Sequence, residues 1–156
     1  MNDAAPDQRR DDRSERWVCF ELATQSYALP ILSVQEVLSG AEIEPVPGAP
    51  RTVLGVVNLR GTIVTVLDLR LRLGLPAAHG PLPSCLVIVD GPGEAVAVQV
   101  DRVVDVRCIA CAAIKPLPRC GNAATPELLG VVCREEQTLT LLDALALVSP
   151  LNRVSH

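Results

Sequence analysis

The chain repeats a series of short motifs, in the same order, in its first and second halves. The first copy consists of Ala28, Glu36-Val37, Ile43-Glu-Pro-Val-Pro47, Leu54-Gly-Val-Val57 and Thr65-Val-Leu-Asp68. The second copy consists of Ala97, Asp105-Val106, Ile114-Lys-Pro-Leu-Pro118, Leu129-Gly-Val-Val132 and Thr140-Leu-Leu-Asp143. The separation between the copies changes only from 69 to 71 to 75 residues along the series. Five matches in one order indicate that the fold is built from two related units.

The units are predicted to consist of β-strands. Short apolar runs, punctuated by Pro, Gly and Asp, occupy 17–22, 27–30, 53–59, 62–67, 85–89, 95–100 and 138–142. Such evenly spaced runs are typical of an all-β barrel or sandwich, and Asp90-Gly-Pro-Gly93 predicts a hairpin turn. Only 31–39 and 143–148 have a helical pattern. We expect Leu54–Val57 and Leu129–Val132 to occupy equivalent, mostly buried positions.

The charge and the aromatic content exclude some classes of partner. A formal net charge of −4, with one Trp, one Tyr and one Phe, argues against a nucleic-acid surface. No apolar run approaches the ~18 residues that a membrane-spanning helix needs. The first 16 residues are polar rather than a secretory signal. We therefore expect a cytoplasmic protein without direct membrane insertion.

The cysteines raise the alternative of a zinc-binding or redox module. Cys108 and Cys111 form a CxxC motif, and Cys120 and Cys133 follow. These spacings fit no familiar zinc module, and a free Cys within an apolar run behaves as a small hydrophobic residue. We expect no metal and no cofactor.

No constellation of catalytic residues is visible. His79 lies in a Pro/Gly/Ala-rich stretch and His156 is the last residue, so neither is expected to act as a general base. Asp68 and Asp143 end equivalent runs, a position more typical of a strand end than of an acid–base pair. There is no Walker loop and no GxGxxG motif after a strand. We expect the protein not to be an enzyme.

The segment Asn58-Leu-Arg-Gly61 differs between the two copies. The second copy has Cys133-Arg-Glu-Glu136 in its place, although the flanking motifs are kept. The same corner can therefore be built without Arg60, which favours a contact role for this arginine. Gly61 can still serve a turn with positive φ that the second copy forms otherwise.

Several motifs together resemble the CheW family of bacterial chemotaxis coupling proteins. They are Tyr27-Ala-Leu-Pro-Ile31, Val34-Gln-Glu-Val37, Pro45-Val-Pro-Gly-Ala-Pro50, Gly55-Val-Val-Asn-Leu-Arg-Gly61, Leu67-Asp-Leu-Arg70 and Val100-Asp-Arg-Val-Val-Asp-Val106. The resemblance spans nearly everything from Trp17 to Leu147. The chain departs from the family pattern at Thr65, where Pro is usual, and at the charged segment Cys133–Glu136.

The resemblance implies an all-β fold of two SH3-like five-stranded barrels that share a hydrophobic core, with short helices. We place this domain at 16–150, with one subdomain at roughly 24–75, the other at roughly 85–143, and the chain ends completing the barrels. Residues 1–15 are expected to form a disordered tail, and 151–156 a C-terminal tail.

The resemblance also implies a non-catalytic adaptor. It would couple the cytoplasmic tips of methyl-accepting chemoreceptors to the regulatory domain of a CheA-type histidine kinase, in membrane-associated arrays and in rings with other CheW-like domains. A coupler in a non-flagellar pathway (pili, surface sensing or cyclic-di-GMP output) and a fragment of a larger kinase or receiver fusion are the alternatives.

The family's partner-contact positions can be carried over to this sequence. Glu36 and Arg60 match a charged pair near the contact surfaces, and we expect them to lie close together. The positions in or beside those contacts are Val34, Gly55, Asn58, Leu59 and Gly61.

Overall fold

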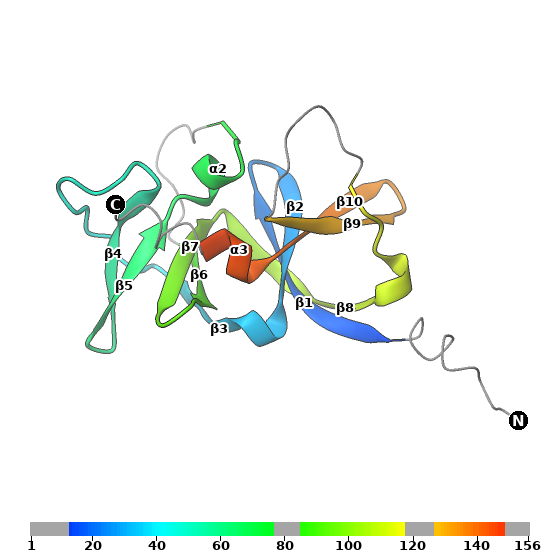
Figure 1. The fold of residues 1–156 in the computed structure, drawn as a ribbon, viewed down its shortest axis with the longest axis horizontal. Helices are drawn as coiled ribbons and strands as arrows, with labels where there is room; N and C mark the ends of the chain where they lie inside the picture. Colours follow the sequence, from blue (N-terminus) through cyan, green and yellow to red (C-terminus); the bar gives the residue numbers. More distant parts are fainter. Residues whose placement is uncertain (1–12, 77–84, 118–126, 149–156) are drawn as a thin grey trace, which may run out of the picture.

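The computed structural model describes residues 13–76, 85–117 and 127–148, and these fold into two five-stranded sheets (Figure 1). Sheet A has the strand order β8 (Arg102–Ala110), β1 (Ser14–Leu22), β2 (Gln25–Pro30), β10 (Gln137–Leu142) and β9 (Leu128–Arg134). Sheet B has the order β3 (Val34–Ser39), β6 (Cys85–Asp90), β7 (Ala95–Val100), β5 (Thr62–Leu67) and β4 (Val53–Leu59). The short helices are η1 (Ile31–Ser33), α2 (Leu69–Arg72), η2 (Cys111–Ala113) and α3 (Ala144–Val148). The prediction of an all-β fold with short helices is confirmed.

The two sheets are copies of one another at the level of residue register. When β1–β5 are matched to β6–β10, the order of sheet A becomes the order of sheet B. In the parallel pairing within each sheet, Ala28 of β2 lies opposite Leu141, and its counterpart Ala97 of β7 lies opposite Val66. The duplication read from the motifs is therefore present in the structure.

The sheets divide the chain differently from the subdomain ranges 24–75 and 85–143. Strand β2 belongs to sheet A, with the strands of the second copy, whereas β6 and β7 belong to sheet B, with those of the first. The two copies have thus exchanged their first hairpins, β1–β2 and β6–β7. A sequence repeat shows the order of elements along the chain, but it does not show which copy each strand pairs with. The chain crosses between the sheets at η1 and at Asp101.

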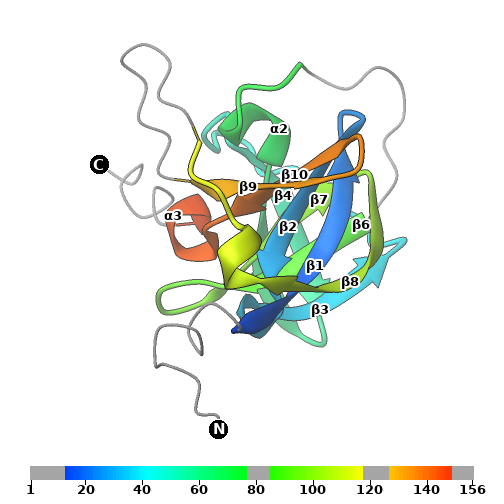
Figure 2. The same ribbon diagram turned by 90° about the vertical axis from the view of Figure 1, so that its right-hand side faces the viewer.

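Each sheet curls around its own apolar interior, and we call the two curled sheets barrel A and barrel B. The interior of barrel A takes residues from all five strands: Trp17, Cys19, Ala28, Ile109, Val132, Leu139 and Leu141. The interior of barrel B contains Val57, Val64, Val66, Leu86, Ile88 and Ala97, with Leu38 of β3 packed against them. Figure 2 shows β8, β1 and β2 as neighbours in barrel A.

A third cluster, which we call the shared core, joins the barrels. It includes Phe20 and Leu29 from sheet A, Val87 and Val98 from sheet B, and Leu147 from α3. These side chains are fully buried, so the barrels are held together by the hydrophobic effect. The predicted common core is confirmed.

Some of the local predictions were wrong. The possible helix at 31–39 is helical only at η1, because 34–39 pairs with β6 as strand β3 and its exposure alternates from residue to residue. The tail predicted at 1–15 ends earlier, since Ser14 and Glu15 pair with β8. Residues 1–12 and 151–156 lie outside the described residues. In the motif Leu129–Val132, which was expected to be mostly buried, Leu129 is exposed, whereas Val132 is buried as expected.

Other local predictions were right. Strands β6 and β7 form the hairpin predicted around Asp90-Gly-Pro-Gly93. The helical pattern at 143–148 corresponds to α3. Within the ranges that the structure describes, no helix is long and apolar enough to cross a membrane.

Candidate functional site

The β4–β5 hairpin turns at Arg60 and Gly61, at one corner of barrel B. Leu59 and Thr62 are the last paired residues, and both turn residues have positive φ, 50° and 87°. This is the two-residue turn that matches the twist of the flanking strands, and Gly adopts it at little cost. The Asn58 Oδ1 atom accepts a hydrogen bond of 2.8 Å from the Gly61 N–H. Asn58 and Gly61 are therefore explained by the geometry of the turn.

The side chain of Arg60 has a different role, because it bonds Glu36 across the barrel. Arg60 Nη2 lies 2.5 Å from Glu36 Oε2, and Nη1 lies 3.3 Å from Oε1. The two residues come from β3 and from the end of β4, which are the opposite edges of sheet B. This ion pair, which we call the edge clasp, therefore spans the open edge of barrel B. The expectation that the two charges lie close together is confirmed.

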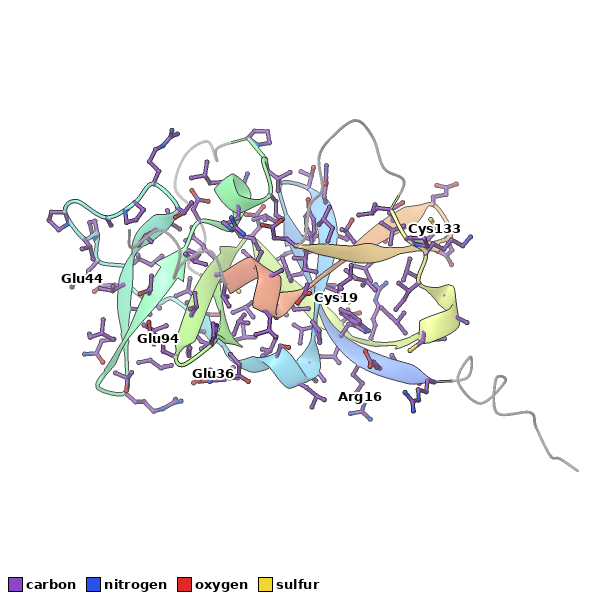
Figure 3. The ribbon with its side chains drawn as sticks, viewed as in Figure 1. Arg16, Cys19, Glu36, Glu44, Glu94 and Cys133 are labelled. Atoms are coloured by element: carbon purple, nitrogen blue, oxygen red, sulfur yellow. The ribbon has the colours of Figure 1, made fainter. Side chains whose placement is uncertain are left out.

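The edge clasp is open to solvent. The side chain of Arg60 is 73% exposed and that of Glu36 is 26% exposed. The pKa of the Arg60 guanidinium is raised, first by its hydrogen bond to the Glu36 carboxylate and then by the charge of that carboxylate. A solvent-exposed ion pair adds little to folding stability. Figure 3 labels Glu36 on β3, at the lower side of barrel B.

Barrel A lacks the clasp. Its equivalent positions are Asp105 on β8 and Glu135 in the β9–β10 turn, where φ is 53°. Two carboxylates cannot form an ion pair, and Asp105 instead accepts a hydrogen bond of 3.3 Å from Arg107 Nε. The same fold thus forms without the clasp, so folding alone does not account for Glu36 and Arg60.

Gly55 is required by close packing. A Cβ atom at Gly55 would lie 2.2 Å from the carbonyl oxygen of Glu44. Glu44 and Val56 exchange two backbone hydrogen bonds of 2.8 Å, which fasten the segment before β4 onto that strand. Gly130 has the same relationship with Lys115 in barrel A. Close packing therefore accounts for the glycine at position 55, and no contact with a partner protein is needed to explain it.

The two remaining predicted positions lie in different surroundings. Leu59 is partly buried against the interior of barrel B. Val34, the first residue of β3, is partly buried against the shared core. The structure thus brings Glu36, Asn58, Leu59, Arg60 and Gly61 to one corner, with Gly55 further along β4 and Val34 nearer the junction of the barrels.

A groove with a mixed polar and apolar lining lies beside the clasp, and sequence reasoning missed it. It runs along β4, and its lining includes Glu44, Val56, Asn58 and Ile63. Ile63 lies opposite Asn58 in the β4–β5 ladder, and it is 62% exposed. Its counterpart in barrel A is Thr138. An Ile at a position where the second copy has Thr was the signal in the sequence that could have pointed to this surface.

The cysteines show no arrangement for binding a metal ion in the described ranges. Among those residues, no three His, Cys, Asp or Glu side chains are grouped to hold an ion. The five described cysteines are free thiols, and Figure 3 shows Cys133 well separated from Cys19. Cys120 and both histidines lie outside the described residues.

The two carboxylates considered for catalysis cap helices instead. Asp68 Oδ1 accepts a hydrogen bond of 3.3 Å from Leu71 N–H at the start of α2. Asp143 Oδ1 accepts from the N–H groups of Leu145 and Ala146, at 3.1 Å and 3.4 Å, at the start of α3. These are ordinary N-cap bonds, and they repeat in both copies.

Comparison with known proteins identifies the family. A sequence model of the CheW-like domain matches residues 16–151. The chemotaxis protein CheW of Klebsiella aerogenes is 29% identical over 136 residues, covering 86% of this chain and 82% of that protein. The chemotaxis protein CheW of Rhizobium meliloti is 31% identical over 65% of each chain. Protein FrzA of Myxococcus xanthus is 36% identical over 76% of this chain and 74% of its own.

A solved structure matches as well. The crystal structure of the scaffolding protein CheW from Thermoanaerobacter tengcongensis superposes with a TM-score of 0.77 at 29% identity. The match covers 86% of this chain and 92% of that one. It confirms the predicted architecture of two SH3-like subdomains.

Proposed function

Because the chain belongs to the CheW-like family, we propose that it is a non-catalytic adaptor that couples the components of a chemotaxis signalling pathway. The observation that carries this proposal is the family match over residues 16–151, which takes in both barrels. The related proteins are chemotaxis and scaffolding proteins. An adaptor needs separate surfaces for separate partners, and two exposed surfaces are available.

The first surface is the clasp corner of barrel B, and its partner is the CheW-like regulatory domain of a CheA-type histidine kinase. The clasp offers two charges that contribute little to folding, and the adjacent groove offers Ile63 and Val56. Apolar contact supplies affinity, while a charge pair at the rim fixes the register of a partner. The planar guanidinium of Arg60 can turn from Glu36 to a carboxylate of the kinase.

The second surface lies where the barrels meet, and its partner is the helical cytoplasmic tip of a methyl-accepting chemoreceptor. Leu32 on η1 is 91% exposed, and Val37 and Val106 are also exposed. In Figure 1, η1 lies along the lower side of the molecule between β3 and β8, the strands that carry the two valines. Exposed apolar side chains on adjacent elements are typical of an interaction site, and an amphipathic helix is a partner of matching chemistry. Val34, the residue after η1, packs against the shared core next to this surface.

These two contacts would place the protein in the cytoplasm at membrane-associated receptor arrays. Two different surfaces that do not overlap allow a receptor and a kinase to bind at once. The kinase domain is itself CheW-like, so the same corner can join other CheW-like domains into rings.

Reconstitution with purified partners tests the proposal. Added to ATP alone, the protein should neither hydrolyse it nor transfer phosphate. Added to a CheA-type kinase and receptor signalling fragments together, it should raise the rate of kinase autophosphorylation. A kinase rate that stays constant across a wide range of adaptor concentration would contradict the coupling function.

A further inference from the structure

The interiors of the two barrels differ in charge at one position, although the barrels are copies. Leu38 on β3 packs its side chain into the interior of barrel B. The residue at the same place on β8 of barrel A is Arg107, which lies opposite Trp17 in the β1–β8 ladder. Trp17 and Ile109 both belong to the barrel A interior, and side chains two residues apart share a face, so Arg107 points inward as well. A guanidinium thus occupies a position that barrel B fills with an aliphatic side chain.

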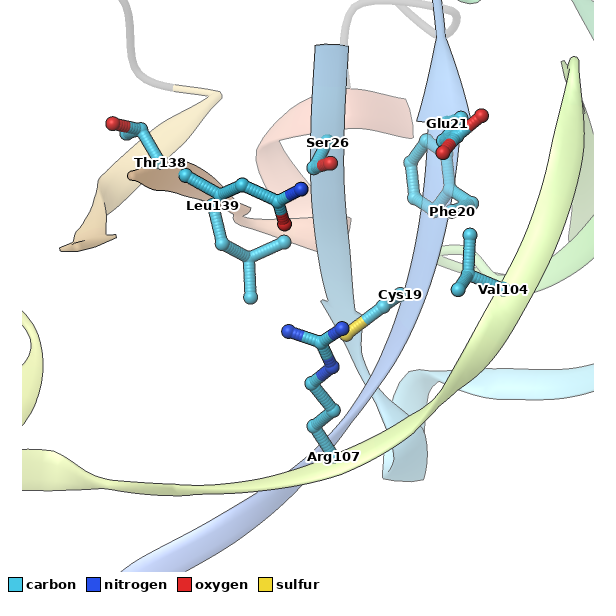
Figure 4. A pocket seen from close by; sticks show the side chains of 9 residues that line it. Cys19, Phe20, Glu21, Ser26, Val104, Arg107, Thr138 and Leu139 are labelled. Atoms are coloured by element: carbon cyan, nitrogen blue, oxygen red, sulfur yellow. The ribbon is translucent and has the colours of Figure 1, made fainter. Parts of the chain in front are cut away.

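A cavity of about 180 Å³ lies beside this arginine. It is lined by residues from β1, β2, β8 and β10, including Cys19, Ser26, Val104, Arg107 and Leu139. Figure 4 shows the Arg107 guanidinium next to the Cys19 sulfur, with Leu139 and Ser26 further along the cavity. The cavity is thus lined by one basic and one acidic side chain, Arg107 and Glu21, beside apolar and polar uncharged side chains.

The guanidinium of Arg107 is incompletely bonded. Its Nε donates one long hydrogen bond, 3.3 Å, to Asp105 Oδ2. Its two Nη atoms have no hydrogen-bond partner among the described residues, and the side chain is only 32% exposed. The contact with Asp105 is an ion pair, which partly neutralises the guanidinium, and neither Nη atom is buried without a partner. The Nη donors form an unfilled fork at the cavity, and a carboxylate is the group whose geometry matches such a fork.

The other walls suit the rest of such a ligand. Leu139 and Val104 provide apolar surface, and the Ser26 hydroxyl is a further donor. The carboxylate of Glu21 is already held by Arg102, with N–O distances of 2.9 Å and 3.1 Å, and this hydrogen bonding lowers its pKa. Burial is the main reason that the pKa of the Cys19 thiol is raised to about 11, so the thiol stays neutral at physiological pH. The lining carboxylate of Glu21 is thus paired, and Asp105 shares the Arg107 guanidinium with the ligand's carboxylate.

We propose that the interior of barrel A binds a small aliphatic carboxylate, with its carboxylate on the Nη atoms of Arg107 and its chain against Leu139 and Val104. A ligand packed at about 0.74 of this volume has roughly six to eight non-hydrogen atoms, as in the linear acids from butanoate to hexanoate. This site faces the interior of barrel A, whereas the clasp corner lies on barrel B and the second surface, which includes Val106 on β8, is exposed on the outside. The proposed ligand site is thus independent of the coupling function, and an experiment can support or overturn either proposal without the other.

An NMR titration of the full chain with butanoate, pentanoate and hexanoate tests the proposal. We expect saturable shifts of the Cys19, Arg107 and Leu139 signals below about 50 mM, since so small a ligand binds weakly. Hexanamide, which has the same chain and no charge, should bind at least about tenfold more weakly. Shifts that do not saturate, shifts centred elsewhere, or equal binding of the amide would overturn the proposal.

Two variants locate the charge that is responsible. Arg107→Leu reproduces the residue of barrel B and should reduce hexanoate affinity at least about tenfold while the protein stays folded. Arg16→Leu removes one exposed positive charge from the same barrel, outside the cavity lining, and should leave affinity unchanged. Unchanged binding by Arg107→Leu, or equal losses in both variants, would overturn the proposal. If Arg107→Leu does not fold, Arg107→Gln takes its place, and the comparison of acid with amide on the natural chain still decides the outcome.

Discussion

Arg60 and Glu36 join the two opposite edges of sheet B through hydrogen bonds of 2.5 Å and 3.3 Å. The related barrel A has Asp105 and Glu135 at the same two places, and it forms without an ion pair between them. A pair that one copy has and the other lacks is not a requirement of the fold. The asymmetry between two copies in one chain is the strongest structural reason to assign the clasp to partner binding.

The close approach of Gly55 to the Glu44 carbonyl predicts a steric cost. Gly55→Ala would place a methyl group 2.2 Å from that backbone oxygen, so the segment before β4 must shift. We expect a loss of about 1–3 kcal/mol in the free energy of unfolding, measured by urea denaturation. Gly40→Ala is the control, because Gly40 has a φ of 76° but no atom within 4 Å of the added Cβ. An equal loss in both variants would show that backbone conformation, rather than the contact with Glu44, is what Gly55 supplies.

The buried ion pair between Arg72 and Glu127 predicts a larger effect. Arg72 on α2 donates to Glu127 beside β9, and both side chains are largely buried where the two barrels meet. Arg72→Met leaves the Glu127 carboxylate buried without its partner, which should cost about 3–5 kcal/mol of stability. The double variant Arg72→Met with Glu127→Met removes both charges and should recover most of that loss. If the double variant is as unstable as the single one, the two side chains stabilise the fold by their packing rather than by compensating each other's charge.

The buried thiol of Cys19 predicts a dependence of stability on pH. Its pKa is raised from about 9 to about 11, first by burial and then by the negative charge of Asp105. Between these values the folded chain keeps the proton that the unfolded chain has lost, so stability must fall as pH rises through this window. Cys85 and Tyr27, whose pKa values burial also raises, act in the same direction. Urea denaturation at pH 8 and pH 10 should therefore show a smaller decrease for Cys19→Ala than for the natural chain.

Thiol accessibility gives a second measurement of the same group. A thiol reagent should modify the exposed Cys108 and Cys133 quickly in the folded protein and Cys19 only on unfolding. Rapid labelling of Cys19 in the folded state would contradict its burial in the barrel A interior.

The repeat and most of the strands could be predicted from the sequence, because each depends on a local pattern. The clasp could be predicted from the resemblance to the CheW family. It did not reveal the exchange of hairpins between the sheets, since β2 and β7 pair with strands more than 30 residues away along the chain. The pattern at 31–39 favours a helix, since Val34, Val37 and Leu38 have helical spacing, but the pairing of 34–39 with β6 overrides it. The inward position of Arg107 was also invisible, because an arginine in a strand is ordinarily on the solvent face.

The affinity of Arg60→Glu for the regulatory domain of a CheA-type kinase tests the central claim most directly. The substitution is compatible with the turn, since Glu135 occupies the matching place at a φ of 53°. It converts the clasp into two like charges, as barrel A already has. Glu135→Arg is the matched control, with the opposite charge change on the other barrel. Titration calorimetry for both variants, together with their melting temperatures, gives the comparison. We expect Arg60→Glu to have a melting temperature close to that of the natural chain and to lose at least about tenfold in affinity. Glu135→Arg should keep both the melting temperature and the affinity of the natural chain. Equal affinity of Arg60→Glu and the natural chain, or unfolding of Arg60→Glu, would contradict the assignment of the clasp to partner binding.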